Sequence, residues 1–355
     1  MRKRRLRVVV CGTTFGRFYL NGIKRISDDY ELVGILARGS DNSKQCAKEY
    51  GVPIYTSVDE INKEDVDVAC VVIRSSIVGG YGSKIAMDFL KKGINVVQEQ
   101  PIHQQDVIEG FKTSKKNNCQ FIINSFYPYI DTVSEFINTA EKLIKKTKAV
   151  YIDAACSIQV LFPLIDMLGR IAGGFMPWKL ENEKIIKSGI FTICTGKIKN
   201  IPFIIKIQNK LNTEDPDNYF HLLHRITLGC ESGSLVLTEV NSHVLWIPRI
   251  FISKNQLGVL DMYEKSRFLN LPVSELVKSP GEVTYKEVYE EVWPDAIKNM
   301  LIKYKDVLSE GKRDNNHVQH YLSVCKIWNE IGQAIGNNES LGSEQIIPLS
   351  IKDLN

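Results

Sequence analysis

The stretch LRVVVCGTTFG, residues 6–16, places a short apolar run directly before a glycine turn. Parallel strands that are buried on both faces are continuous apolar runs, so Leu6–Cys11 is predicted to be an interior strand. Gly12 permits the tight turn that follows, and Gly16–Ile26 has the apolar periodicity of a helix. This order of strand, glycine turn and helix predicts the first unit of an α/β sheet.

The alternation of strand and helix continues as far as Ser125. Further strands are predicted at 30–37, 67–73, 95–98 and 120–125, with helices at 42–50, 83–92 and 105–117. Strands that alternate with helices form parallel sheets with helices on both faces. We therefore predict a Rossmann domain, a doubly wound parallel sheet, over residues 1–127.

Beyond residue 127 the pattern changes, because strand-like segments follow one another after one long helix. They lie at 148–154, 189–195, 201–208, 223–229 and 234–240. Consecutive strands favour an open, mostly antiparallel sheet. Two helices, predicted at 285–309 and 317–335, close the chain and are expected to pack back on the first domain. The predicted fold class is thus α/β, with a Rossmann domain followed by an α+β domain at 128–355.

Composition limits the classes of function. The chain has 355 residues, which is enough for two domains. Its net charge of +4 comes from Lys and Arg residues scattered along the chain, so no extended basic surface for nucleic acid is predicted. The basic run at residues 1–7 is interpreted as a solvated lead-in to the first strand. No apolar window reaches the roughly 20 residues of a membrane span, and no signal-peptide core precedes the glycine turn, so a cytoplasmic protein is expected.

The positions of cysteine and histidine argue against a metal site. The eight cysteines are widely spaced, form no CxxC pair and mostly lie in apolar runs, so reduced core thiols are predicted. Two His-x-x-His pairs, His221/His224 and His317/His320, have no Cys or carboxylate ligand at the spacing that a zinc site needs. We predict no metal ligand.

The glycine turn is the candidate site for the pyrophosphate of a dinucleotide. The predicted loop consists of Gly12, Thr13, Thr14, Phe15 and Gly16, and backbone N–H groups at the helix start that follows favour an anion. Threonine and arginine replace the second and third glycines of the G-x-G-x-x-G fingerprint, and an extra glycine comes one position early. A tight turn without a ligand is the alternative.

The end of the second strand indicates which nicotinamide nucleotide fits. NAD sites carry Asp or Glu there for the ribose 2′-OH, whereas NADP sites carry cationic and hydroxyl groups for a 2′-phosphate. Arg38 and Ser40 offer such donors, and no carboxylate comes before Asp41, so NADPH is the predicted cofactor. A solvated surface arginine is the alternative. Arg74 and Ser75, at the end of the next buried strand, are predicted to contact the cofactor or an acidic substrate group.

The run VVQEQPIH, residues 96–103, ends a further strand at the same edge. With the two-part layout, its Glu99-Gln100-Pro101 segment resembles the Gfo/Idh/MocA oxidoreductase superfamily, in which a Glu-Lys-Pro motif ends a Rossmann domain and an open antiparallel sheet follows. Gln100 replaces the lysine that assists proton transfer from a sugar hydroxyl, and an amide is neither an acid nor a base. Pro163 stands where the sugar enzymes carry a histidine. Both departures argue against sugar oxidation.

A narrower resemblance extends over both domains. The runs VVIRSSIVGGYGS, QEQPIH, SFYPY, CSIQVLFPLIDMLGR and PDNYFHLLHRITLG, at 71–83, 98–103, 125–129, 156–170 and 216–229, are similar to the thiazolinyl imine reductases of siderophore biosynthesis. This resemblance implies NADPH-dependent reduction of a thiazoline C=N to a thiazolidine. It also implies a substrate held as a thioester on the carrier domain of a nonribosomal peptide synthetase. The superfamily further implies a homodimer that is built on the second domain.

The reduction needs a hydride at the imine carbon and a proton at the nitrogen. The family's candidate acids are the His of a Glu-His-Pro motif and the Tyr of a Tyr-Pro segment. The Tyr carries over as Tyr127, whereas Gln100 occupies the position of the His. We predict Tyr127 as the proton donor, Gln100 as a group that orients substrate or water, and His103 as a relay. The alternatives are a core aromatic residue at the domain joint for Tyr127 and a helix cap for His103.

Three residues at strand ends complete the predicted cofactor contacts: Glu99, at the nicotinamide ribose, Gln100 and Asn124. Two other functions stay open. One is an NADP-dependent oxidoreductase of the superfamily that acts on a free small molecule. The other is a non-catalytic NADP-binding regulator, which the loss of the superfamily's lysine favours.

Overall fold

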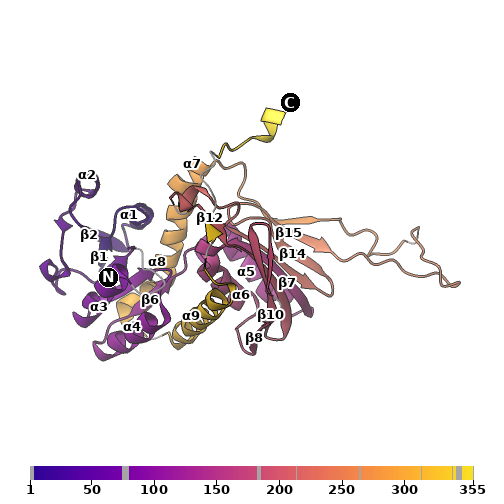
Figure 1. Ribbon diagram of the computed structural model, residues 1–355, viewed down its shortest axis with the longest axis horizontal. Coiled ribbons are helices and arrows are strands. Elements are labelled where there is room, and N and C mark those ends of the chain that lie inside the picture. The colour runs from indigo at the N-terminus through magenta and orange to yellow at the C-terminus, as the bar shows by residue number, and fades with distance from the viewer. Residues whose placement is uncertain are drawn as a thin grey trace.

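Two sheets of different kinds form the two lobes of the molecule (Figure 1). A computed structural model describes residues 4–73, 80–181, 185–212, 214–263, 265–312, 314–337, 339–340 and 346–354. A six-stranded parallel sheet forms the first lobe, and a nine-stranded, mostly antiparallel sheet forms the second. The predicted fold class is confirmed.

The first sheet is doubly wound, with the strand order β3-β2-β1-β4-β5-β6. Its strands are β1 (Leu6–Cys11), β2 (Tyr30–Leu36), β3 (Ile54–Tyr55), β4 (Val68–Val71), β5 (Asn95–Glu99) and β6 (Phe121–Asn124), and its helices are α1 (Gly16–Lys24), α2 (Asp41–Tyr50), α3 (Tyr81–Lys91) and α4 (Gln104–Lys116). Every side chain of the central strand β4 is buried, as its continuous apolar run predicts. Because the strand order reverses between β1 and β4, a ligand crevice is expected at the carboxyl ends of these strands.

The second sheet is mixed. Its strands are β7 (Ala149–Ser157), β8 (Trp178–Leu180), β9 (Ile186–Ser188), β10 (Phe191–Ile198), β11 (Ile201–Gln208), β13 (His224–Cys230), β14 (Gly233–Leu237), β15 (Val244–Pro248) and β16 (Glu275–Lys278). Only β7 and β11 pair in parallel among these described strands. Helices α5 (Asp131–Leu143) and α6 (Leu161–Ile171) pack against one face. A separate short pair joins β12 (Lys210–Leu211) to β17 (Glu339–Ser340).

The C-terminal helices contact both lobes. They are α7 (Tyr285–Glu287), a π-helical turn (Val288–Val292), α8 (Trp293–Glu310) and α9 (Asn315–Ile335). Helix α8 lies against α1, and Gly22 permits the close approach because a Cβ at that position would lie 2.9 Å from the Pro294 carbonyl oxygen. Helix α9 packs on both α4 and α6. These helices therefore help to fix how the two sheets face each other.

The cysteines belong to the core. All eight are buried free thiols, as predicted. Burial raises the pKa of Cys11 and Cys70, on the two central strands, so these thiols stay protonated and unreactive. None of the described helices combines the length and the apolar composition that a membrane span requires.

Replacing Gly12 by alanine is expected to destabilise the protein more than replacing Gly51. Both glycines have positive φ, +99° and +66°, but a Cβ at Gly12 would lie 2.6 Å from the Val72 carbonyl oxygen, whereas nothing lies within 4 Å at Gly51. We expect Gly51→Ala to lower the free energy of unfolding by about 1 kcal/mol. For Gly12→Ala we expect a loss of about 2 kcal/mol or more. Urea unfolding measures both, and equal losses would mean that the turn relaxes to accept the methyl group.

Candidate active site

Most of the predicted site residues lie at the carboxyl ends of the parallel strands, along one edge of the first sheet. The loop at residues 12–16 follows β1, Arg38 follows β2, and Glu99 ends β5. Asn124 ends β6, and Tyr127 begins the short 3-10 helix η2 (Tyr127–Tyr129). Arg74 and Ser75 lie outside the described residues. The sheet therefore brings the described candidates to one side.

The loop after β1 has the form of an anion cradle. The Gly12 N–H donates to the Leu36 carbonyl oxygen at 2.9 Å, and the absence of a Cβ lets the loop approach the strand end after β4. Helix α1 begins at Gly16 with no side-chain cap and no acidic residue in its first turn, so its N-terminal N–H groups suit a pyrophosphate. The Phe15 ring packs against Phe126, with 5.3 Å between the centroids, and anchors the loop.

The two candidate contacts for a 2′-phosphate differ in whether their polar atoms already have a partner among the described residues. The Arg38 side chain is exposed and forms no ion pair with any described residue. The Ser40 hydroxyl instead caps helix α2, accepting a hydrogen bond from the Ser43 N–H at 3.4 Å. Arg38 is therefore the stronger candidate for an anionic group, since the Ser40 oxygen already has a structural partner.

Glu99 lies in a buried hydrogen-bond network that sequence reasoning did not anticipate. Its Oε2 accepts from the Tyr19 hydroxyl at 2.5 Å and from Asn124 Nδ2 at 3.1 Å. Asn124 Nδ2 also donates to the Tyr19 oxygen at 2.7 Å. Burial raises the pKa of Glu99 to about 8, although these hydrogen bonds act in the opposite direction. The carboxyl group is thus mostly protonated at neutral pH.

This network changes the interpretation of Glu99 and Asn124. Asn124 is fully buried, and its Oδ1 accepts from the Phe126 N–H at 2.9 Å. Both predicted cofactor contacts therefore have partners within the protein, and their roles toward a nucleotide stay predictions. The sequence patterns did not predict Tyr19 as a partner of Glu99. Tyr19 lies on the apolar face of α1, and its hydroxyl is the one feature of the sequence that indicates a polar contact there.

Tyr127 packs against a histidine of the second sheet. Its side chain is buried, and its ring packs edge-to-face on His224 of β13 at a centroid distance of 4.6 Å. Its hydroxyl has no hydrogen-bond partner among the described residues, and burial raises its pKa, so the phenol stays protonated. Tyr127 thus packs at the domain joint, as its alternative interpretation holds, while its predicted role as a proton donor stays a prediction.

His224 is neutral and has one free nitrogen. Its Nε2 lies 2.7 Å from the Val160 carbonyl oxygen, which can only accept, so Nε2 carries the proton. Burial lowers the pKa of His224 to about 4. Its Nδ1 and the Oε1 of Gln100 are buried atoms without a hydrogen-bond partner in the described structure. Such atoms are costly to bury, and a ligand that donates hydrogen bonds would satisfy them.

His103 occupies the capping position at the start of α4. Its Nδ1 accepts from the Gln105 N–H at 3.3 Å, which confirms the helix-cap alternative. This contact occupies one ring nitrogen, so a relay could use only Nε2. The relay role stays a prediction.

A charged cluster joins the two lobes near the carboxyl edge of the first sheet. The buried Asp166 carboxylate accepts from Arg170 Nε at 2.7 Å, Tyr321 at 2.9 Å and the Ser125 hydroxyl, and His320 Nε2 lies 2.5 Å away. Burial would raise the pKa of Asp166, but the charges of Arg170 and His320 and their hydrogen bonds outweigh burial and lower it.

The histidines of the two His-x-x-His pairs differ in their burial and in their contacts. His317 Nε2 accepts from the Ile123 N–H at 3.0 Å, and Nδ1 lies 3.0 Å from the Tyr304 hydroxyl. His221 is exposed, whereas its pair member His224 is buried against Tyr127. Within the described ranges, no group of three His, Cys, Asp or Glu side chains has an arrangement that could hold a metal ion.

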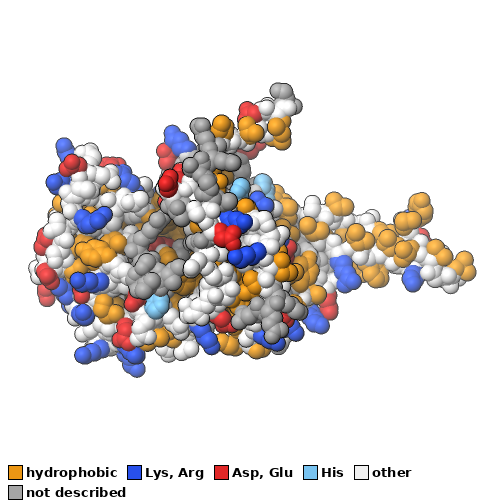
Figure 2. All heavy atoms as spheres, in the orientation of Figure 1, with side chains coloured by type: hydrophobic (Ala, Val, Ile, Leu, Met, Phe, Trp, Pro, Cys, Tyr) orange, Lys and Arg blue, Asp and Glu red, His pale blue; other side chains and the backbone are white. Residues whose placement is uncertain are grey.

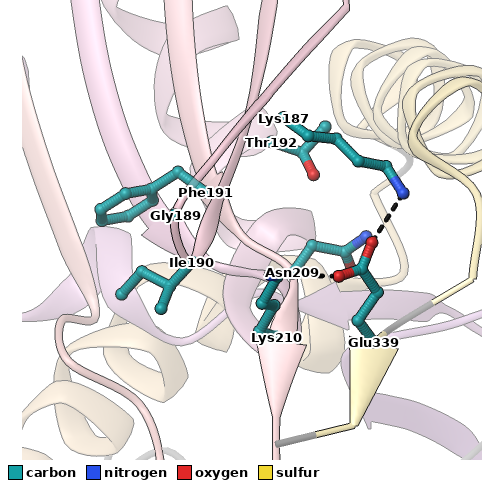
Figure 3. Close-up of a pocket in the computed structure, with 8 residues that line it drawn as sticks. All are labelled: Lys187, Gly189, Ile190, Phe191, Thr192, Asn209, Lys210 and Glu339. Carbon is teal, nitrogen blue, oxygen red and sulfur yellow. Dashed lines mark hydrogen bonds and ion pairs between the residues drawn. The ribbon is translucent and has the colours of Figure 1, made fainter.

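A cavity of about 130 Å³ lies elsewhere, in the second lobe (Figure 3). Glu339 of β17 closes it through ion pairs with Lys187 at 2.7 Å and Lys210 at 3.3 Å. No predicted site residue lines it, and its ion pairs attach the C-terminal segment to the second sheet. The strand edge of the first sheet therefore remains the candidate site.

Comparisons with known proteins agree with this placement. Residues 6–125 match the profile described as oxidoreductase family, NAD-binding Rossmann fold, of the GFO_IDH_MocA type. The first domain is thus a Rossmann domain of the Gfo/Idh/MocA oxidoreductase family. Residues 147–247 of this oxidoreductase match the profile described as thiazolinyl imine reductase Irp3-like, C-terminal. None of the curated proteins compared with the chain matches it.

Solved structures share the fold of this chain at low sequence identity. The dehydrogenase MviM from Clostridium difficile has a TM-score of 0.68 at 13% identity, covering 92% of this chain and 99% of that chain. The 3-ketoreductase KijD10 from Actinomadura kijaniata, solved with NADP, has 0.66 at 10%, covering 96% and 100%. An Agrobacterium radiobacter oxidoreductase, solved with NAD+, L-tartaric acid and magnesium, has 0.65 at 9%, covering 92% and 95%. These likenesses concern the fold alone. The family match supports a nicotinamide cofactor, which the cradle at Gly12 fits.

Stability is expected to depend on pH through Glu99. The pKa of this carboxyl rises from 4.5 to about 8 on folding, so between these values the folded chain keeps a proton that the unfolded chain has lost. Its contribution to the free energy of unfolding therefore falls as pH rises through this window, by about 1.4 kcal/mol per pH unit, and then stays constant. Urea unfolding of Glu99→Gln should lack this fall, while Glu141→Gln, at an exposed residue of α5, should keep it. Parallel profiles for the wild type and Glu99→Gln would contradict the raised pKa.

Proposed function

We propose that the protein reduces the C=N bond of a thiazoline to a thiazolidine with NADPH. The observation that carries this proposal is the Tyr127 hydroxyl, which is protonated and has no partner among the described residues beside the neutral His224. The Irp3-like match of the second domain supports a thiazoline as the substrate. The amide at Gln100, in place of the superfamily's lysine, disfavours oxidation of a sugar hydroxyl.

When bound, the nicotinamide supplies the hydride for the imine carbon. Tyr127 donates a proton to the nitrogen, and its raised pKa keeps the phenol protonated until the nitrogen gains basicity during hydride transfer. The buried, unpartnered atoms of Gln100 and His224 accept hydrogen bonds from the ligands and orient them. Tyr127 thus moves the proton, whereas Gln100 and His224 accept hydrogen bonds without changing their own protonation.

The end of β2 supports NADPH rather than NADH as the cofactor. Arg38 is exposed there without an ion pair to a described residue, and Asp41, the first carboxylate after it, lies within α2. A guanidinium fork suits a 2′-phosphate, whereas a site for NAD places a carboxylate at this position.

The family relationship supports a carrier-bound substrate. We propose that the substrate is an intermediate of siderophore biosynthesis, held as a thioester on the carrier domain of a nonribosomal peptide synthetase. The eight buried free thiols support a reducing, cytoplasmic location. A non-catalytic NADPH-binding protein is the second candidate, which the amide at Gln100 favours. NADPH binding without turnover of any thiazoline thioester would identify that case.

The variant Tyr127→Phe tests the proton donor. With a synthetic thiazoline thioester and NADPH, we expect kcat to fall about 100-fold or more, because only the transition state loses its proton source. The dissociation constant for NADPH should stay unchanged. The control Tyr151→Phe changes a half-exposed tyrosine on the second sheet and should leave both values intact. Loss of reduced-nicotinamide absorbance measures the rate, and an unchanged rate in Tyr127→Phe would remove this residue from the role.

The variant Arg38→Ala tests the choice of nucleotide. We expect NADPH binding to weaken by about 1 to 3 kcal/mol, the range of a charge-assisted contact, and NADH binding to change little. Lys44→Ala removes a nearby cation that pairs with Asp41 and serves as the control. Calorimetric titration with both nucleotides measures the difference. Equal weakening for NADPH and NADH would contradict a phosphate contact.

A further inference from the structure

A second cavity, of about 270 Å³, lies beside the Asp166 cluster at the joint between the lobes. Its walls come from η2, α5, α6 and α8, so segments far apart in the sequence close around it. None of the described residues that line it was predicted to hold the nucleotide or to move the proton. This cavity, which we call the joint cavity, is therefore distinct from the candidate active site.

Charge on the outer surface does not by itself create an anion site. On the face that Figure 2 shows, Lys and Arg side chains are dispersed over both lobes, with Asp and Glu side chains among them. Isolated surface cations bind anions weakly, because water and salt screen their charges. A specific anion site needs two or more cations that are held together in a cavity, and the joint cavity provides such a pair.

Arg170 and Lys303 line the joint cavity from α6 and α8, on either side of its wall at η2. The Arg170 Cζ lies 5.9 Å from the centre of the Tyr129 ring, and the Lys303 Nζ lies 5.4 Å from the same point. Arg170 donates from Nε and Nη2 to Asp166, at 2.7 Å and 3.2 Å, and no described residue accepts from its Nη1. The guanidinium is thus held in place with one donor group available to a ligand.

Lys303 has no ion-pair partner among the described residues. Its Nζ forms no hydrogen bond with them either, and it lies over two tyrosine rings. Desolvation and the charge of Arg170 lower the pKa of Lys303. The carboxylates of Asp166, Asp314 and Glu141 act in the opposite direction but do not outweigh these effects. An anion placed beside the two cations would stabilise both charges.

Uncharged donors line the same cavity. Ser134 and Asn138 lie one turn apart on α5, on one face of the helix. The Ser134 hydroxyl and the Asn138 amide have no hydrogen-bond partner among the described residues. They can therefore donate to the oxygens of an anion that the two cations hold.

Two carboxylates also line the joint cavity and limit what can bind there. Asp131 is paired with Lys278, 2.5 Å away. Glu141 forms no ion pair with a described residue and would repel an anion. The charged group of a ligand is therefore expected beside Arg170 and Lys303, and an uncharged part is expected along the rest of the cavity.

The donors of the joint cavity suit a phosphate group. A guanidinium and an ammonium group, with two neutral donors, match the three terminal oxygens of a phosphate ester. The volume of about 270 Å³ is several times the roughly 30 Å³ share of one water, so a bare phosphate ion would not fill it. We propose that the joint cavity binds a phosphate monoester, with the phosphate between Arg170 and Lys303 and the organic part in the remaining space. This proposal does not depend on the proposed reaction.

Calorimetric titration of the full chain at constant ionic strength tests the site, with glycerol 3-phosphate and inorganic phosphate as probes. We expect the ester to bind more tightly than the bare ion. Lys303→Met should weaken binding of the ester at least about 10-fold, because it removes a charge-assisted contact and keeps the apolar stem, whereas Lys303→Arg should retain binding. The control Lys298→Met removes a cation of α8 that pairs with Asp295 outside the cavity, and it should leave binding unchanged.

Two further variants separate the joint cavity from the nucleotide site. Glu141→Gln removes a repelling charge and should tighten binding of the ester, whereas Arg38→Ala, at the end of β2, should leave it unchanged. Binding that is lost in Arg38→Ala and kept in Lys303→Met would place the phosphate at the nucleotide site and overturn the proposal. Absence of binding in the wild type would also overturn it, as would equal weakening by Lys303→Met and Lys298→Met.

The ester is also expected to stabilise the folded chain, because the joint cavity exists only where four elements meet. The midpoint of thermal unfolding should rise with the concentration of glycerol 3-phosphate in the wild type and in Lys298→Met, but not in Lys303→Met. A wild-type midpoint that does not respond would contradict binding to the folded chain. None of these measurements uses the thiazoline reaction, so failure here is distinguishable from failure of the proposed function.

Discussion

Asp166 is a fully buried carboxylate that holds the joint between the two lobes. Its partners come from both sides: Ser125 directly follows the last strand of the first sheet, Arg170 lies on α6, and His320 and Tyr321 lie on α9. Removing one partner would leave a buried charge without compensation, which is strongly destabilising. The cluster thus helps to fix the first sheet's edge against the second lobe, and the meeting of the two sheets at the candidate site depends on that position.

Two buried carboxyl groups near this joint have pKa values that are shifted in opposite directions, although burial alone would raise both. Arg170 and His320 keep the pKa of Asp166 low, whereas the donors that the described residues give to Glu99 (Tyr19, Asn124 and the Gln100 N–H) are neutral, so burial raises its pKa to about 8. The first group is therefore a permanent charge that holds structure. The second, at the strand edge where a nicotinamide nucleotide is expected, can exchange a proton near neutral pH.

Sequence patterns predicted the first sheet well because buried parallel strands such as β4 are continuous apolar runs. Interactions between distant segments were not predictable in this way. Tyr19 and Glu99 are far apart in sequence, and their contact depends on the register of α1 against β5. His224 was recognised only as a member of a weak metal pair, since nothing local shows that β13 faces Tyr127. The segment between β15 and β16 lacks the sequence periodicity of a strand or helix, so its apolar residues predicted no element.

Transfer of a labelled hydride tests the account most directly. The protein is incubated with a thiazoline thioester and NADPH that carries deuterium at the transferable position of C4, and the product is examined by mass spectrometry and NMR. The account predicts a thiazolidine with one deuterium on the former imine carbon and a solvent-exchangeable proton on nitrogen. An unchanged thiazoline, or deuterium at any other carbon, would contradict it.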